Sequence, residues 1–119
     1  MGHVRVKVEI ANPARRGDAI DVPEALVDTG ATWTTIPRRI AEQLSLDIVG
    51  QTMVRTAAGP QQLDQSYAYM AIQGKDIVSF VLISDTYPGV LVGVTTLEGL
   101  GFAVDPNSGR LVDSELLLL

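Results

Sequence analysis

Short apolar runs alternate with polar residues along most of the chain. The first run alternates Val4, Val6 and Val8 with charged residues, which is the two-residue period of a strand with one buried face. Further extended runs are separated by residues typical of turns, and they cover 19–22, 24–27, 48–49, 52–54, 66–72, 77–83, 90–93, 102–104 and 110–112. Many short strands at close intervals indicate an all-β fold, either a barrel or a sandwich.

Helical spacing occurs at only two places. Pro37 is typical of the first turn of a helix, and apolar residues recur at helical spacing as far as Leu44. Later, Thr95 or Thr96 is predicted to cap a helix that runs through Leu100 and ends at the glycine that follows. We therefore expect one or two short helices beside the sheet.

The composition is that of a folded chain with a real core. The chain has 119 residues, of which 46% are hydrophobic and 19% charged, so it does not resemble a disordered segment. Its length suits one domain, and no internal repeat or linker divides it. We expect a single domain over residues 1–119.

Charge and hydropathy exclude two kinds of partner. The nine basic residues are scattered among fourteen acidic ones, for a net charge of −5, whereas phosphate binding needs clustered Lys and Arg. No apolar run reaches the roughly 18–20 residues of a membrane helix, and the N-terminal pattern is not that of a signal peptide. We expect neither nucleic acid nor a membrane as partner.

Cysteine is absent, and His3 is the single histidine. Disulfides, thiolate nucleophiles and cysteine-rich zinc sites are excluded. Because the single histidine lies beside the initiator Met and there is no other, we do not expect a Ser-His-Asp triad or a histidine metal site. The chemistry that remains belongs to carboxylates, with no metal and no cofactor expected. A chain without cysteine also suits a reducing compartment, and we expect a cytoplasmic location.

The candidate catalytic residue is Asp28, which follows an apolar run and precedes Thr29, Gly30 and Ala31. Hydrolysis of a peptide by carboxylates needs two of them close together, one acting as base and the other as acid. Taken alone, Asp-Thr-Gly occurs by chance in roughly a few per cent of chains this long. Its other interpretation is a turn in which the Asp side chain bonds to the backbone.

The context of this motif favours catalysis. An apolar strand ending in glycine (Leu91, Val92, Gly93) and a short helical stretch lie downstream, and a hairpin with small residues near its tip (Ala57, Ala58, Gly59) lies between. This ordered set resembles the retropepsin family of single-domain aspartic proteases, and the resemblance extends over about Val4 to Val112. It implies a closed acid-protease barrel with one or two short helices.

The resemblance also assigns roles to residues. It implies that Asp28 is catalytic, that the Thr29 hydroxyl reaches across a dimer axis, and that the hairpin is a flap that closes over a peptide or protein substrate. It implies further that Leu91, Val92 and Gly93 line the substrate pocket beside the active loop. For Trp33, a role in the pocket wall and a plain packing role are equally open.

Two departures from the viral members stand out. Those members have acidic residues soon after Asp-Thr-Gly-Ala, where this chain has Thr32 and Trp33, and they follow the late glycine with Arg-Asn, where this chain has Val94 and Thr95. The pattern is more similar to the cellular and prokaryotic members.

One motif in one short chain implies that the second carboxylate comes from another copy. We therefore expect a homodimeric aspartic endopeptidase that activates water between two Asp28 carboxylates, with the four C-terminal leucines buried at the subunit interface. The alternative is a catalytically inactive dimerisation or peptide-binding module that keeps the fold.

Overall fold

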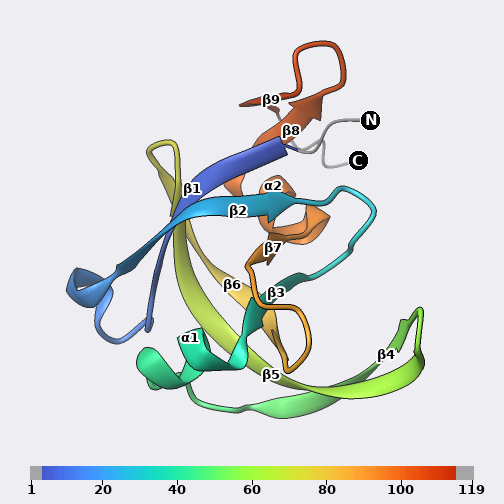
Figure 1. The fold of residues 1–119 in the computed structure, drawn as a ribbon. Coiled ribbons are helices and arrows are strands. Elements are labelled where there is room, and N and C mark those ends of the chain that lie inside the picture. Colours follow the sequence, from blue (N-terminus) through green and yellow to red (C-terminus); the bar gives the residue numbers. More distant parts are fainter. Residues whose placement is uncertain (1–3, 115–119) are drawn as a thin grey trace, which may run out of the picture.

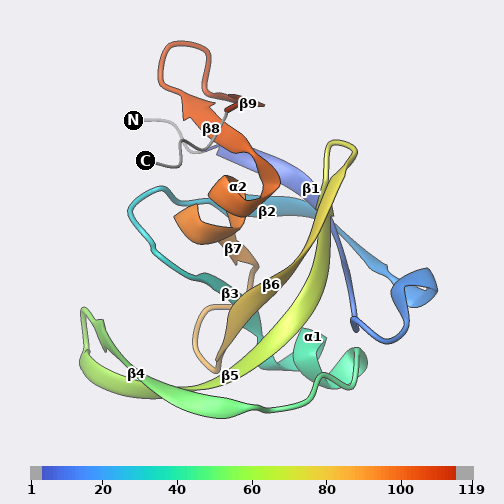
Figure 2. The ribbon, with the colours of Figure 1, turned by 180° about the vertical axis from the view of Figure 1, so that it is seen from behind.

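The computed structural model describes residues 4–114, and six of its strands close into a barrel (Figures 1 and 2). The strands are β1 (Val4–Ala11), β2 (Ile20–Val27), β3 (Thr34–Pro37), β4 (Gly50–Thr56), β5 (Gly59–Ile72), β6 (Lys75–Ser84), β7 (Leu91–Val92), β8 (Phe102–Asp105) and β9 (Arg110–Asp113). The helices are α1 (Arg38–Gln43), α2 (Val94–Leu100) and the short 3-10 turn η1 (Arg16–Asp18).

Closure of the barrel comes from the pairing of its first strand with one of its longest. The hydrogen-bonded order is β1-β2-β7-β3-β6-β5, and β1 pairs again with β5, whereas β4 pairs with β5 alone. Side chains that alternate inward fill the barrel, and the largest of them that are fully buried include Ile10, Ile36, Met70, Ile72 and Ile83. Closure leaves the barrel with no free edge of its own.

Most of the predicted strands are confirmed, with differences at three places. The predicted run 48–49 is not a strand and lies in the loop before β4. The runs 19–22 and 24–27 form one strand, β2, which continues through Pro23 opposite an irregularity of register in β1. Strand β3 was not predicted, although Thr34 and Ile36 are fully buried between β6 and β7. Its four residues are too few to show a period, so its position depends on tertiary pairing.

The predicted cap of the second helix is wrong. Helix α2 begins at Val94 with Gly93 as its N-cap, while Thr95 and Thr96 lie inside the first turn. Its predicted end is confirmed, because Gly101 follows with φ of 78° in the left-handed region. No helix in the described part of the chain is long and apolar enough to cross a membrane.

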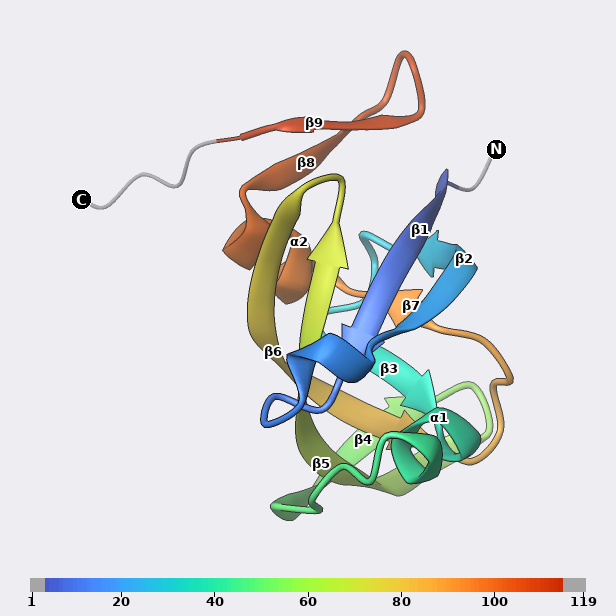
Figure 3. The same ribbon diagram turned by 90° about the vertical axis from the view of Figure 1, so that its left-hand side faces the viewer.

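A second sheet of two strands, β8 and β9, extends beyond the barrel next to α2 (Figure 3). Phe102 and Leu111 are buried and join the hairpin to the core. Lys75, at the start of β6, ties it further: its Nζ donates to the Gly101 carbonyl (3.1 Å), pairs with Asp113 (2.8 Å) and lies 4.4 Å from the centre of the Phe102 ring. The four C-terminal leucines lie outside the described residues.

Candidate functional site

The loop between β2 and β3, residues 28–33, is called here the Asp28 loop, and it is fixed at its start by two strands that run in parallel. The Leu26 amide donates to the Val90 carbonyl (2.9 Å), and the Asp28 amide donates to the Val92 carbonyl (3.0 Å). Asp28, the residue after β2, therefore lies at the end of β7, where the Asp28 loop begins. Strand β2 lies between β1 and β7 in the sheet, and its residues Ala25 and Val27 are buried, which explains the apolar run before the aspartate.

Asp28 itself sits in a tight turn. The Gly30 amide donates to Asp28 Oδ1 (2.9 Å), and the Ala31 amide donates to the Asp28 carbonyl (3.1 Å). A Cβ added at Gly30 would lie 3.2 Å from Asp28 Oδ1, so a side chain there would press on the carboxylate. The Asp28 side chain is half-buried and Thr29 is exposed, so both are available at the surface of the chain.

The far side of the loop is held by helix α2. The first amides of a helix have no partner within the helix, and here Val94 donates to the Ala31 carbonyl (2.8 Å) and Thr95 donates to the Thr32 carbonyl (3.1 Å). The Thr95 hydroxyl donates to the same Thr32 oxygen (2.7 Å). These bonds brace the loop at the positions where Arg-Asn and the acidic residues of the viral members are replaced.

Glycine is required at position 93 because two backbone segments pass very close to each other there. A Cβ at this position would lie 2.5 Å from the Trp33 carbonyl oxygen and 2.9 Å from the Thr34 nitrogen. Only glycine lets β7 turn into α2 so close to the strand that follows the Asp28 loop. The glycine at the end of the apolar run is thus explained by packing.

A buried chain of hydroxyls, which was not predicted from the sequence, lies beneath the loop. Thr34 Oγ1 accepts from the Gly93 amide (3.0 Å) and contacts Thr96 Oγ1 (2.6 Å), which in turn contacts Ser79 Oγ (2.7 Å). All three side chains are buried, and each hydroxyl has a partner within the chain. The available signal was the presence of threonine in otherwise apolar segments, where a buried hydroxyl needs a partner.

The hairpin of β4 and the first half of β5, residues 50–65, is called here the flap hairpin. Its tip is Ala57 and Ala58, followed by Gly59 with φ of 106°, and Thr56 Oγ1 donates to the Gly59 carbonyl (2.8 Å). Residues 52–56 and 59–63 pair only with each other, so the tip projects from the barrel as a two-stranded ribbon. The ribbon projects from the same side of the barrel as the Asp28 loop (Figures 1 and 2).

The predicted pocket residues differ in what they expose. Trp33 is 40% exposed and packs edge-on against Phe80, with ring centres 4.9 Å apart, so it has both a packing face and an open face. Leu91 is half-buried. Val92 lies fully in the core and Gly93 is buried, so these two contribute to the site through their backbone.

Other features of the surface lie away from these residues. A depression of about 610 Å³ opens between β1 and the turn from β5 to β6, and it is lined by none of the predicted site residues. Within residues 4–114, no three His, Cys, Asp or Glu side chains gather so as to hold a metal ion. The Asp28 loop remains the place where predicted chemistry and ordered geometry coincide.

Comparison with known proteins yields a family match. A family model described as "gag-polyprotein putative aspartyl protease" matches residues 21–99. The match begins in β2 and ends in α2, so it contains the Asp28 loop, the flap hairpin and Gly93. A search of curated proteins found no match.

Proposed function

Because the chain belongs to the gag-polyprotein aspartyl protease family and has its retropepsin-like barrel, we propose that it is an aspartic endopeptidase whose active site forms between two copies. The observation that carries the proposal is the Asp28 carboxylate. It is half-exposed, follows a strand clamped by β7, and has one oxygen oriented by the Gly30 amide. The preorganised loop suits a group that must meet a partner at fixed geometry.

The reaction needs a pair of carboxyl groups that share one proton. The ionised one takes a proton from water as the water oxygen bonds to the peptide carbonyl carbon. The protonated one gives its proton to the carbonyl oxygen, and a gem-diol results. The C–N bond then breaks as the nitrogen gains a proton and the diol loses one, which yields a carboxyl group and an amine.

The rest of the proposed site follows from the half that one chain supplies. Asp28 of a second copy is the other carboxyl group, and Thr29, which is exposed, contacts the partner's loop. The flap hairpin covers an extended peptide, with the open face of Trp33 and the exposed part of Leu91 as walls. The absence of cysteine leads us to place this activity in the cytoplasm.

Cleavage of an unfolded protein at acid pH tests the proposal. Wild-type protein should cut denatured casein into peptides, a transition-state-like inhibitor of aspartic proteases should stop it, and Asp28→Asn should be inactive. Sedimentation should show a dimer at the concentrations used. If the protein binds denatured casein without cleaving it, or is a monomer at high micromolar concentration, the proposal is contradicted.

A further inference from the structure

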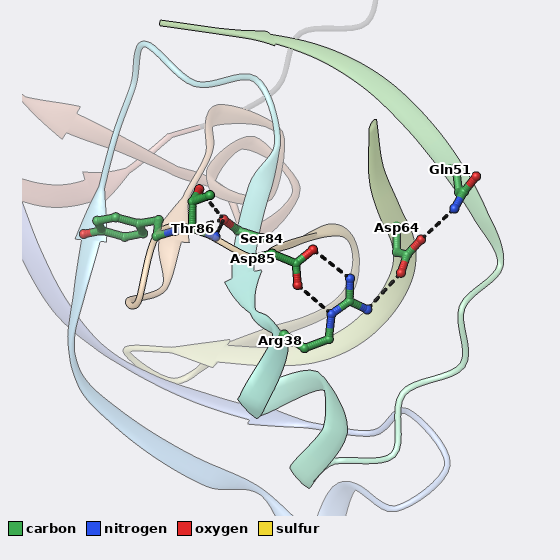
Figure 4. A network of polar contacts seen from close by, with 7 residues as sticks. Arg38, Gln51, Asp64, Ser84, Asp85 and Thr86 are labelled. Atoms are coloured by element: carbon green, nitrogen blue, oxygen red, sulfur yellow. Dashed lines mark hydrogen bonds and ion pairs between the residues drawn. The ribbon is translucent and has the colours of Figure 1, made fainter. Parts of the chain in front are cut away.

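One arginine links two parts of the candidate site that are distant in sequence. Arg38 is the first residue of α1, and its guanidinium contacts two carboxylates (Figure 4). Nε and Nη2 donate to the two oxygens of Asp85 (2.9 and 3.0 Å), and Nη1 donates to Asp64 Oδ2 (2.8 Å). A planar guanidinium has the fork of donors that such a double contact needs.

Asp64 marks the root of the flap hairpin. It is the first residue of β5 that pairs with β6, opposite Ile83, so the ribbon leaves the barrel at this point. It also faces Gln51 of β4, whose Nε2 donates to Asp64 Oδ1 (3.0 Å). The Asp64 side chain is only 21% exposed. Arg38 therefore contacts β5 directly through Asp64, and it is linked to β4 through Asp64 and Gln51, at the point where the hairpin leaves the barrel.

Asp85 opens residues 85–90, the stretch between β6 and β7, called here the wall segment. The amides of Thr86 and Tyr87 donate to Ser84 Oγ (3.2 and 3.1 Å), which makes a compact turn. The neighbouring Arg39 donates to the Pro88 carbonyl (2.9 Å). The segment ends at Val90, whose carbonyl accepts from Leu26 two residues before Asp28. Its position thus bears on the base of the Asp28 loop.

On the basis of the proposed function, we propose that Arg38 is a positioning residue that couples the flap root to the wall segment. Arg38 then sets the positions of both the flap hairpin and the wall segment. Among residues 4–114, no hydrogen bond joins Asp64 directly to the wall segment or Asp85 directly to the flap hairpin. The Arg38 side chain is 34% exposed. Its ion pairs are therefore only partly screened by water, and the desolvation cost of holding the charged groups together is small.

Hydrogen exchange on the full-length protein tests this coupling without need of cleavage. Asp85→Asn should speed exchange at the flap root, residues 49–52 and 62–65, although the substitution lies in the wall segment. Asp64→Asn should speed exchange of Thr86 and Tyr87. Each effect should be about two- to fivefold, the size expected when a partly exposed ion pair is lost.

Three further variants separate coupling from local loosening. Asp21→Asn removes an exposed surface pair with Lys7 (3.8 Å) and should change neither segment. Arg39→Gln should loosen the wall segment and leave the flap root protected. Arg38→Lys keeps the charge but lacks the fork of donors. It should therefore keep wild-type protection from exchange in at most one of the two segments.

Several results would overturn the coupling. These are exchange that rises only in the element carrying each Asp→Asn change, a flap root loosened equally by Arg39→Gln, or full protection of both segments in Arg38→Lys. In an active enzyme, Arg38→Gln should raise KM by a larger factor than it lowers kcat, because substrate enclosure is loosened while the carboxyl pair is intact. If wild type cuts nothing, the proposed function fails while the exchange data still decide the coupling.

Discussion

Gly93 and Asp28 show two different ways in which a residue is fixed. Gly93 is required by steric contact, since its α-carbon faces the backbone of Trp33 and Thr34. Under the proposed function Asp28 is required by chemistry, since the turn around it would accept other residues that bond to the Gly30 amide. The two positions therefore predict opposite outcomes on substitution, one affecting stability and the other affecting catalysis.

Gly93→Ala should destabilise the fold. The added methyl group meets backbone atoms, which cannot swing aside as a flexible side chain would, so we expect a loss of about 1–3 kcal/mol. Urea unfolding at neutral pH measures it. The matched control is Gly17→Ala in η1, where an added Cβ meets nothing within 4 Å. Equal stability of the two variants would contradict the steric explanation.

Asp28→Asn should lower the rate of peptide cleavage by at least about 100-fold, because the amide keeps the shape and the Gly30 contact but cannot accept or supply the shared proton. Its unfolding midpoint and its sedimentation should match those of wild type. Steady-state cleavage of a peptide substrate measures the loss. Cleavage at the wild-type rate would show that Asp28 is not the catalytic group.

At the scale of elements, the sequence predicts what is periodic and misses what depends on pairing. The long strands β1, β5 and β6 and the end of α2 follow from alternation, turn residues and glycine. Strand β3 could not be predicted, because its four residues become a strand through pairing with β6 and β7. The cap of α2 was wrong because Thr95 and Thr96 bond to the loop and the core.

The candidate site divides in the same way. Asp28, the small-residue hairpin tip and Gly93 could be found from motif and order. The hydroxyl chain and the Arg38 contacts could not, because they join residues separated by 17 to 62 positions. The assignment to cellular and prokaryotic members, and the role of each pocket residue, stay predictions.

The flap hairpin should be the most mobile internal segment of the free protein. Its ribbon pairs with nothing beyond itself, and Met53 is 66% exposed, so little burial opposes opening. Hydrogen exchange over residues 55–61, beyond the flap root, should be fast in the free protein and slow by about tenfold or more with a peptide-like inhibitor bound. Exchange that is unchanged at saturation would rule out a lid, and the β1–β2 ladder serves as the internal control.

For the whole molecule, the contacts of Arg38 predict a specific sensitivity to acid. The pKa of Asp64 is lowered by the hydrogen bond from Gln51 and then by Arg38, and the pKa of Asp85 is lowered by Arg38. A carboxyl whose pKa is lower in the folded state stabilises the fold above its ordinary pKa of about 3.9. That contribution is lost as the pH falls through the lower, folded values.

Replacing both aspartates with asparagine should therefore reduce stability at pH 7, and this reduction should become smaller as the pH falls and the wild-type carboxyls are protonated. Urea midpoints measured from pH 2 to pH 7 give the difference between the two proteins. A difference that stays constant over this range would mean that the ionised pairs do not contribute, and that the loss comes from packing or hydrogen bonding alone.

Whether two copies of Asp28 make one active site can be read from mixed dimers. Wild-type and Asp28→Asn subunits are unfolded together in varying ratio at constant total concentration, refolded, and assayed for peptide cleavage. If both carboxyls are needed, activity follows the square of the wild-type fraction, so an equal mixture keeps about one quarter of full activity. An equal mixture that keeps about one half would show that each subunit acts alone, and it would contradict the shared site.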